Sequence, residues 1–313
     1  MFLFDERGIK LEGVDFWLDA QRATPFSFVS HGHSDHLKNH AQILATPPTI
    51  LFHALRARQK KAVALDYHRP YFVGDLKIEL YPSGHVLGAA MIRIERNGRS
   101  LLYTGDFKIK AGLTAEPIVI PRADILIMES TFGHPAFTFS EEGDPKAQLL
   151  DFIEECIRKK TTPVVMAYGL GKAQEAMKLL GSAGYDVRVH HDAWRIARIY
   201  EQFGISFEGC SLWRHEPLNG RQVLIIPPHA VRFRRAAGLP VKRRTVLLSG
   251  WAKSPLGNRF GADHCIPLSD HADFNELIFF VRQVQPQKIY TLHGFEDFPL
   301  YLRDLGYDAE YLS

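Results

Sequence analysis

Four side chains that can bind metal ions fall within six residues, in the segment His31-Gly-His33-Ser-Asp35-His36. An extended backbone points residues i and i+2 to the same side, so His31 and His33 can reach one ion. The turn that follows lets Asp35 and His36 face a second ion nearby. Two close divalent cations with nitrogen and oxygen ligands activate water and stabilise both oxygens of a phosphoryl displacement. A surface histidine cluster is the alternative, and it requires four coincidences within one turn.

The surrounding pattern predicts strands that end on polar side chains. The expected strands are Phe26–Ser30, Leu76–Tyr81, Met91–Glu95, Ser100–Tyr103 and Asp124–Met128. The residues expected just beyond strand ends are His31, His85, Asp106 and Glu129. Asn97-Gly98 predicts a hairpin between the third and fourth of these strands. The last strand is apolar throughout, which is typical of burial on both faces.

After about residue 135 the pattern changes to alternating helices and short strands. Helices are expected near 145–158, 171–181 and 192–203, between apolar strands at Val164–Met166, Val187–His190 and Val223–Ile226. This alternation predicts βαβ units and a small parallel sheet. A strand at Thr245–Leu248, a helix at 274–284, a strand at Lys288–Leu292 and a short final helix follow. We therefore expect an α/β protein with one domain formed by 1–134 and 251–313, interrupted by a lobe at 135–250.

Composition limits the class of protein. The 313 residues are 46% hydrophobic and 23% charged, which is ordinary for a globular protein. No stretch approaches the roughly 20 apolar residues of a membrane span, and the first residues lack the order of a signal peptide. Three scattered cysteines, Cys156, Cys210 and Cys265, form no disulfide framework and no metal knuckle. A cytoplasmic protein without membrane contact is expected.

The net charge of +3 says little about partners, but its distribution says more. Residues 232–244 contain six basic side chains and no acidic one. Such a stretch attracts phosphate polyanions. A solvated helix end and loop is the alternative interpretation.

The His31–His36 segment, together with His85 and Asp106, resembles the metal motifs of the metallo-β-lactamase superfamily. The resemblance implies an αββα sandwich. It also implies that His85 is the third imidazole of the first metal and that Asp106 bridges both metals. Taken alone, His85 would be an ordinary core histidine and Asp106 a turn residue.

Three later segments resemble motifs A, B and C of the β-CASP group, which cuts nucleic acids. They are Glu129-Ser-Thr-Phe-Gly133, Leu268-Ser-Asp-His271-Ala-Asp273 and Thr291-Leu-His293-Gly294. The resemblance implies two divalent ions, Zn²⁺ and/or Mn²⁺, bridged by the hydroxide that attacks phosphorus. The implied ligands are His31, His33, Asp35, His36, His85, Asp106 and His293. Asp35, Glu129 and His271 are the implied catalytic residues, with Glu129 orienting His271 as the general acid.

Between motifs A and B, Gly169-Leu-Gly171-Lys172 lies between an expected strand and an expected helix. Such a turn presents free backbone N–H groups and a positive helix end, with Lys172 adding a charge. A tight strand-to-helix connection is the alternative. β-CASP enzymes carry a similar segment, so substrate contacts are expected here, at Ser249 and at Ser269.

The whole-chain resemblance is closest to the bacterial DNA-ligase-associated exonucleases and extends from about Gly13 to Tyr311. It implies a DNA exonuclease of DNA repair whose partners are DNA and, additionally, DNA ligase or other repair proteins. The sequence departs from the family pattern in two ways. The inserted lobe is shorter than in large RNA-processing members, and the histidine of motif C is typical of RNA-acting members. An RNA-processing endo- or exoribonuclease is therefore the alternative.

Two further interpretations differ in class. A small-molecule metallo-hydrolase, acting on a β-lactam or thioester, would not need the additional pair Glu129 and His271. A catalytically silent nucleic-acid-binding subunit would be expected to have lost metal residues, whereas all seven candidate ligands are present.

Overall fold

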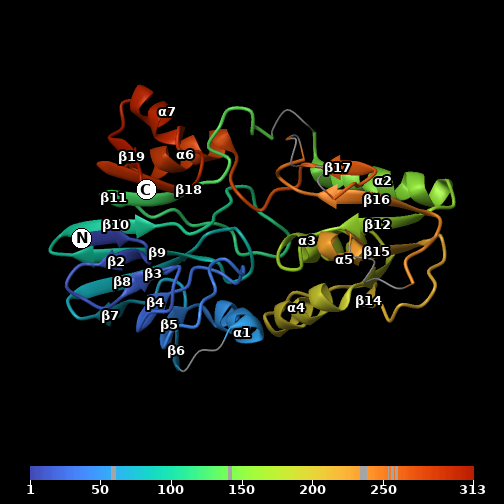
Figure 1. Cartoon of the computed structure of the whole chain (residues 1–313), viewed down its shortest axis with the longest axis horizontal. Coiled ribbons are helices and arrows are strands. Elements are labelled where there is room, and N and C mark those ends of the chain that lie inside the picture. The colour runs from blue at the N-terminus through green and yellow to red at the C-terminus, as the bar shows by residue number, and fades with distance from the viewer. Residues whose placement is uncertain (58–60, 140–142, 233–237, 253, 255–256, 258–259) are drawn as a thin grey trace. The chain divides into compact units, whose positions relative to one another are not determined.

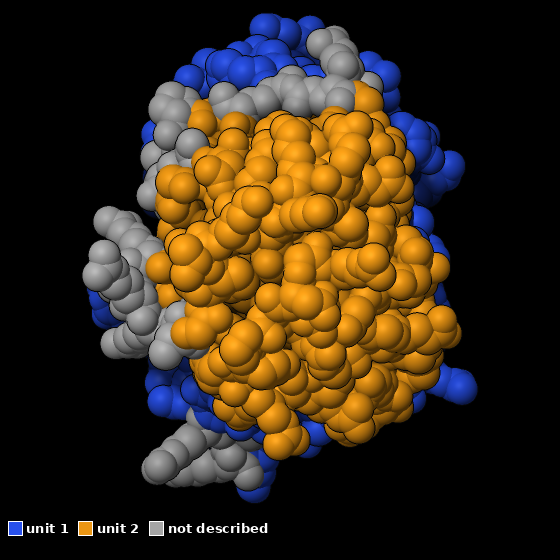
Figure 2. Space-filling model, turned by 90° about the vertical axis from the view of Figure 1, so that its right-hand side faces the viewer, with its two compact units in different colours: residues 1–138, 271–313 blue, residues 139–270 orange. Residues whose placement is uncertain are grey.

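The computed structural model describes residues 1–57, 61–139, 143–232, 238–252, 254, 257 and 260–313. The chain divides into two compact units, shown in different colours in Figure 2. Unit 1 comprises Met1–Thr138 and His271–Ser313, and unit 2 comprises Phe139–Asp270. The expected boundary at residue 251 is wrong, because β17 (His264–Ile266) pairs with β16 (Arg243–Leu248) in the sheet of unit 2.

Unit 1 contains two sheets (Figure 1). The first has the order β1 (Phe2–Asp5), β2 (Gly8–Leu11), β3 (Trp17–Leu18), β4 (Phe26–Phe28), β5 (Gln42–Ala45) and β6 (Lys61–Ala64). The second has the order β19 (Ala309–Tyr311), β18 (Lys288–Gly294), β11 (Ile125–Ser130), β10 (Arg99–Tyr103), β9 (Ala90–Arg96), β8 (Leu76–Pro82) and β7 (Tyr71–Val73). The five strands expected here from the sequence are confirmed.

Alternation along the strands builds two cores around the second sheet. In β10, Leu101 and Tyr103 point toward the first sheet and pack in the core between the two sheets. Leu102 points to the opposite face of the second sheet and packs in a separate core. That other face is covered by α6 (Phe274–Val284) and α7 (Phe298–Asp304). On the far side of the first sheet, α1 (Pro47–Arg56) contributes Ile50 to a small core. Unit 1 is therefore the αββα sandwich that the resemblance implies.

Unit 2 is built on one parallel sheet of six strands. Their order is β14 (Cys210–Leu212), β13 (Asp186–Val189), β15 (Gln222–Ile226), β12 (Thr162–Met166), β16 and β17. Its helices are α2 (Pro145–Arg158), α3 (Lys172–Ser182), α4 (His191–Gln202) and α5 (Pro228–Arg232). The parallel sheet predicted from the alternating pattern is confirmed. No helix in the described part of the chain combines the length and the apolar character that a membrane crossing requires.

A buried histidine makes unit 1 sensitive to acid. The Thr24 N–H donates to His40 Nδ1 at 3.2 Å, while Nε2 has no hydrogen-bond partner among the described residues. Burial, and then the charge of His53, lower the pKa of His40 from 6.5 to about 4. The unfolded chain therefore binds this proton near pH 6.5 and the folded chain only near pH 4, so stability falls as the pH drops through that interval.

We expect this group to remove about 3 kcal/mol of unfolding free energy between pH 6.5 and pH 4. Urea unfolding with a chelator present, at pH 7, 5.5 and 4, measures the slope. The variant His40→Gln should show a shallower slope than the parent chain. Equal slopes for the two chains would contradict the assignment.

Candidate metal centre and proton donor

The predicted ligands converge because the strands that carry them end at one edge of the sandwich. β3 and β4 run parallel in the first sheet, and β10, β11 and β18 run parallel in the second. β8 is antiparallel to β9, which is antiparallel to β10, so β8 also ends at this edge. Loops that follow these strands therefore deliver their side chains to one place.

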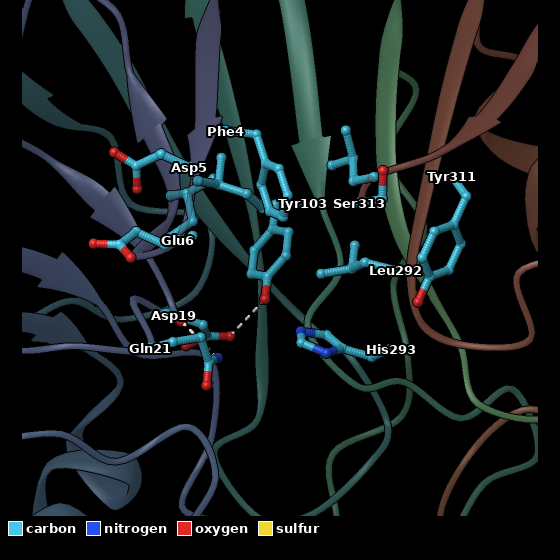
Figure 3. A pocket seen from close by; sticks show the side chains of 14 residues that line it. Phe4, Asp5, Glu6, Asp19, Gln21, Tyr103, Leu292, His293, Tyr311 and Ser313 are labelled. Carbon is cyan, nitrogen blue, oxygen red and sulfur yellow. Dashed lines mark hydrogen bonds between the residues drawn. The ribbon is translucent and has the colours of Figure 1, made fainter.

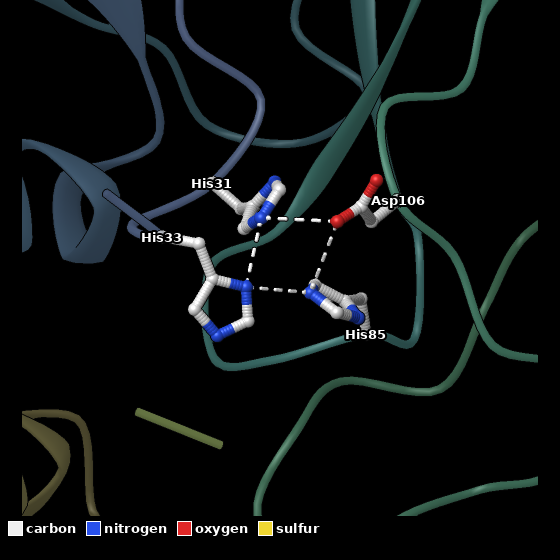
Figure 4. A group of neighbouring side chains, drawn as sticks. All are labelled: His31, His33, His85 and Asp106. Atoms are coloured by element: carbon white, nitrogen blue, oxygen red, sulfur yellow. Dashed lines mark hydrogen bonds and ion pairs between the residues drawn. The ribbon is translucent and has the colours of Figure 1, made fainter. Parts of the chain in front are cut away.

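Four predicted ligands form a tight group (Figure 4). His33 Nδ1 lies 3.0 Å from His31 Nε2 and 3.0 Å from His85 Nε2. Asp106 Oδ2 lies 3.4 Å from His31 Nε2 and 3.7 Å from His85 Nε2. Ligands about 2.1 Å from a shared ion in a tetrahedral arrangement are separated by about 3.4 Å. These side chains therefore fit one divalent cation.

The remaining ligands surround a second position more loosely. His36 Nε2 lies 3.7 Å from Asp35 Oδ2 and 3.8 Å from Asp106 Oδ2. The rings of His36 and His293 have centroids 5.9 Å apart. Asp106 thus faces both groups, as expected for a carboxylate shared by two cations. Of the seven, His293 is more exposed than the other imidazoles and Asp35 is the more exposed carboxylate.

The electrostatics of the cluster favour a bound cation. Burial, and then the charge of Glu129, raise the pKa of Asp106 to about 7. Burial and the charge of His36 push the pKa of His31 well below its usual value. Burial alone would lower the pKa of His36, but the charges of Asp19 and Asp106 outweigh it and raise that pKa to about 10. A buried carboxylate among imidazole nitrogens is stabilised when a cation replaces these protons.

Asp19 is a functional candidate that the sequence analysis missed. It follows β3 and is 2% exposed. Its Oδ2 accepts a hydrogen bond from Tyr103 Oη at 2.9 Å (Figure 3). The same oxygen accepts from Ser30 Oγ at 2.5 Å and lies 3.0 Å from His36 Nδ1. The sequence did contain a signal for this residue, because Asp19 directly follows the apolar run Phe16-Trp-Leu and other site residues also follow strands.

The contact between Asp19 and His36 fixes which ring nitrogen faces the cluster. With Nδ1 directed at Asp19, Nε2 is left to face Asp35 and Asp106. Carboxylates behind metal-binding histidines orient the ring and increase its basicity. We expect Asp19→Asn to weaken metal affinity about 10- to 100-fold. Titration with Zn²⁺ against a competing chelator measures this change, and an unchanged affinity would contradict the role.

Gly105 allows the loop with Asp106 to pack against this network. Its φ is +52°, and a Cβ there would lie 2.6 Å from the Ser30 side chain, which itself bonds to Asp19. Since L residues are disfavoured at this φ and the added atom would displace Ser30, glycine is required before Asp106.

Glu129 and His271 are in direct contact beside the first metal group. His271 Nδ1 lies 2.9 Å and 3.1 Å from the two Glu129 oxygens, and its Nε2 lies 3.9 Å from Asp106 Oδ2. Glu129 is 1% exposed and also accepts the Phe107 N–H at 2.7 Å. With Nδ1 donating to the buried carboxylate, Nε2 is the nitrogen that faces the cluster.

The backbone around His271 is held by unit 1. The Ala272 N–H donates to Phe107 O at 2.8 Å, and the Phe274 N–H donates to Phe137 O at 3.1 Å. Asp273 caps α6, because its Oδ1 accepts the Glu276 N–H at 2.9 Å and its own N–H donates to Glu276 Oε2. The motif that contains His271 therefore lies where the chain returns from unit 2, and it also supplies the N-cap of α6.

The five predicted substrate contacts follow strands of the unit 2 sheet. Gly169, Gly171 and Lys172 come after β12, Ser249 after β16 and Ser269 after β17. Carboxyl ends of parallel strands share one edge, which is where open α/β sheets bind ligands. The structure therefore brings these residues to a common edge, and their contact with substrate stays a prediction.

Two details at this edge differ from expectation. The Gly171 N–H is not free, because it donates to Gln174 Oε1 at 2.9 Å, and Gln174 Nε2 donates back to Gly169 O. The ammonium of Lys172 forms a buried ion pair with Asp270. The turn is therefore stabilised by the chain's own side chains, and Lys172 is less available to a phosphate than its sequence position suggests.

Much of the predicted basic stretch, residues 233–237, lies outside the described residues, as does the Arg232 side chain. At its end, Arg244 pairs with Glu155 at 2.8 Å and Arg243 donates to Pro240 O. Both arginines therefore form contacts within unit 2.

Comparison with known proteins agrees with this geometry. Residues 264–311 match the model of the RMMBL domain, described as a Zn-dependent metallo-hydrolase RNA specificity domain. A probable DNA ligase of Opitutus terrae is 36% identical over 310 residues, covering 96% of this chain and 30% of the relative. The DNA cross-link repair protein SNM1 of Arabidopsis thaliana is 26% identical over 90% of this chain and 64% of its own length. Endoribonuclease YSH1 of Eremothecium gossypii is 36% identical over 37% of this chain and 15% of its own length.

The sandwich, the paired metal groups and the acid–histidine contact define a metallo-hydrolase site at a sheet edge. Its fold, its site and the relatives it matches make the chain similar to the β-CASP nucleases of the metallo-β-lactamase superfamily. The metallo-hydrolase match and the grouped ligands together indicate binding of divalent metal ions. The chain spans less than two thirds of the length of each of these three relatives.

Proposed function

We propose that the protein is a metal-dependent nuclease that hydrolyses phosphodiester bonds in nucleic acid, stepwise from an end. The observation that carries this proposal is the contact between Glu129 and His271 beside the metal groups. Acyl hydrolysis on two metals does not need this additional pair. Expulsion of a sugar oxygen near neutral pH does need a positioned proton donor.

Two bound divalent cations would supply the nucleophile and neutralise charge that develops on phosphorus. His31, His33 and His85 would hold one cation, Asp35, His36 and His293 the other, and Asp106 both. Asp19 orients His36 through Nδ1. Glu129 keeps the Nδ1 proton of His271, so that Nε2 protonates the leaving sugar oxygen. The same contact stabilises the protonated ring before transfer, because the carboxylate charge is buried beside it.

DNA is the favoured substrate, because two relatives that are similar over 96% and 90% of this chain are named for DNA ligation and DNA cross-link repair. A partnership with DNA ligase rests on the Opitutus terrae relative, whose chain is longer than this one. Mn²⁺ is proposed beside Zn²⁺ because nitrogen and carboxylate ligands accept both ions. A reducing cytoplasmic setting agrees with three cysteines that are all free.

An RNA substrate is the second candidate, and a specific observation favours it. The family model that covers His293 is described as an RNA specificity domain, and an endoribonuclease is 36% identical over 37% of this chain. The histidine at this position in motif C also favoured RNA in the sequence.

Matched single strands of DNA and RNA distinguish these candidates. Each strand is labelled at the 5′ or 3′ end, with and without a 5′-phosphate, and incubated with Mn²⁺ or Zn²⁺. We expect a ladder of products on DNA whose order gives the polarity. Hydrolysis of RNA alone would reverse the substrate preference. Hydrolysis of a thioester but of neither nucleic acid would overturn the proposal.

A further inference from the structure

A cavity of about 430 Å³ lies between the free edges of the two sheets of unit 1 (Figure 3). β1 is the outermost strand of the first sheet and β19 is the outermost strand of the second. Apolar and aromatic side chains form much of the wall, among them Phe4, Ile9, Leu18, Leu292 and Tyr311. His293 and Asp19 line the same cavity, so it adjoins the second metal position.

The charges at this cavity do not suit a phosphate. Asp5 and Glu6 line it, and each is paired, with Arg7 at 2.9 Å and with Arg22 at 2.6 Å respectively. Among the described residues that line the cavity, none is a lysine or an arginine. A neutral ligand with flat apolar faces fits such a lining better than a polyanion does.

We propose that this cavity binds the base of a nucleotide next to the scissile phosphate. The inference rests on the proposed function, which places that phosphate at the metal groups. His293 connects the two sites, because it is a candidate metal ligand and also lines the cavity. A nucleotide whose phosphate reaches the metals therefore has its base close to the cavity.

The aromatic side chains supply the binding surface. Phe4 is 39% exposed and Tyr311 is partly exposed, so both rings are accessible to a ligand. Aromatic faces of this kind stack on bases of any sequence. Gln21 also lines the cavity, where its Nε2 donates to Asp19 O at 3.1 Å and its Oε1 can accept from a base edge.

The proposal has a consequence for the state of the substrate. A base that enters a cavity has left its stack and its pairing partner, which costs free energy in a duplex. The enzyme should therefore prefer a strand that is unpaired at the scissile position.

Binding is tested with strands that contain the fluorescent base 2-aminopurine, placed in turn on the 5′ and 3′ sides of the scissile phosphate. The strands are bound to the His271→Ala chain, which is expected to leave them uncut. We expect strong quenching for one of the two positions. Phe4→Ala or Tyr311→Ala, added to this chain, should remove the quenching and weaken binding roughly tenfold.

Phe72→Ala is the matched control. Phe72 is 64% exposed on β7, the outermost strand at the opposite side of the second sheet. Its removal should change neither quenching nor affinity. Equal effects from Phe4→Ala and Phe72→Ala, or no quenching at either position, would overturn the proposal.

A second measurement does not depend on the variants. The unaltered enzyme is given strands in which the same nucleotide lacks its base, and KM is expected to rise roughly tenfold with little change in kcat. Equal KM values for normal and abasic strands would refute base binding while leaving the nuclease function intact. Failure to cut any strand would instead refute the proposed function.

Discussion

Asp106→Asn is expected to reduce turnover about 10³-fold or more and to lower the metal content of the purified chain. The carboxylate of Asp106 lies within 4 Å of ring nitrogens from His31, His36 and His85, so its loss removes the one anion that both metal groups share. Turnover of a labelled strand and metal content by mass spectrometry measure the two effects.

The same substitution should not damage the fold. The pKa of Asp106 is raised from 3.8 to about 7 when no metal is bound, so stability falls as the pH rises through that interval and the full cost is present at pH 8. A neutral amide of the same shape removes this cost, and the metal-free variant should unfold at a similar or higher temperature at pH 8. A variant that keeps two metals per chain and full turnover would show that the cluster is not the reaction centre.

His271→Ala is expected to keep its metals and its melting temperature but to lose about 10²- to 10⁴-fold in turnover on nucleic acid. Its Nδ1 contacts Glu129, and although its Nε2 lies 3.9 Å from Asp106 Oδ2, it is not one of the seven proposed metal ligands. A nucleotide ester of 4-nitrophenol offers a sharper comparison, because nitrophenolate leaves without a proton. The variant should hydrolyse this ester almost as fast as the unaltered enzyme does.

His134→Ala is the control for the proton donor. His134 also lies in unit 1, where its ring packs on Phe295 and its Nδ1 accepts the Ala136 N–H. This variant should retain turnover on both substrates. If His271→Ala slowed the nitrophenyl ester as much as the nucleic acid, the ring would act on the metal site instead of on the leaving group.

Residues that follow strongly patterned strands were predictable from the sequence. His31, His85, Asp106 and Glu129 each follow, directly or within a few residues, a strand with clear alternation or continuous burial. The pattern predicted that these side chains follow strands, and the resemblance to the metallo-β-lactamase superfamily implied that they meet. The prediction that seven side chains hold two metals is compatible with this geometry and awaits the metal measurements above.

The misses have physical causes. Asp19 follows a strand of only two residues, Trp17–Leu18, which is too short for a pattern to reveal. The Gly171 N–H was expected to be free, but the Gln174 side chain reaches back to it, and a sequence does not show the direction of a side chain. The boundary at residue 251 was wrong because β17 has three residues and a weak pattern.

The position of His271 at the first residue after unit 2 affects how the protein can diverge. Because Phe107, Phe137 and the cap of α6 hold the backbone just beyond it, the ring of the proposed proton donor is anchored by unit 1. Residues of the inserted lobe can then be exchanged, lengthened or shortened during evolution without displacing this ring.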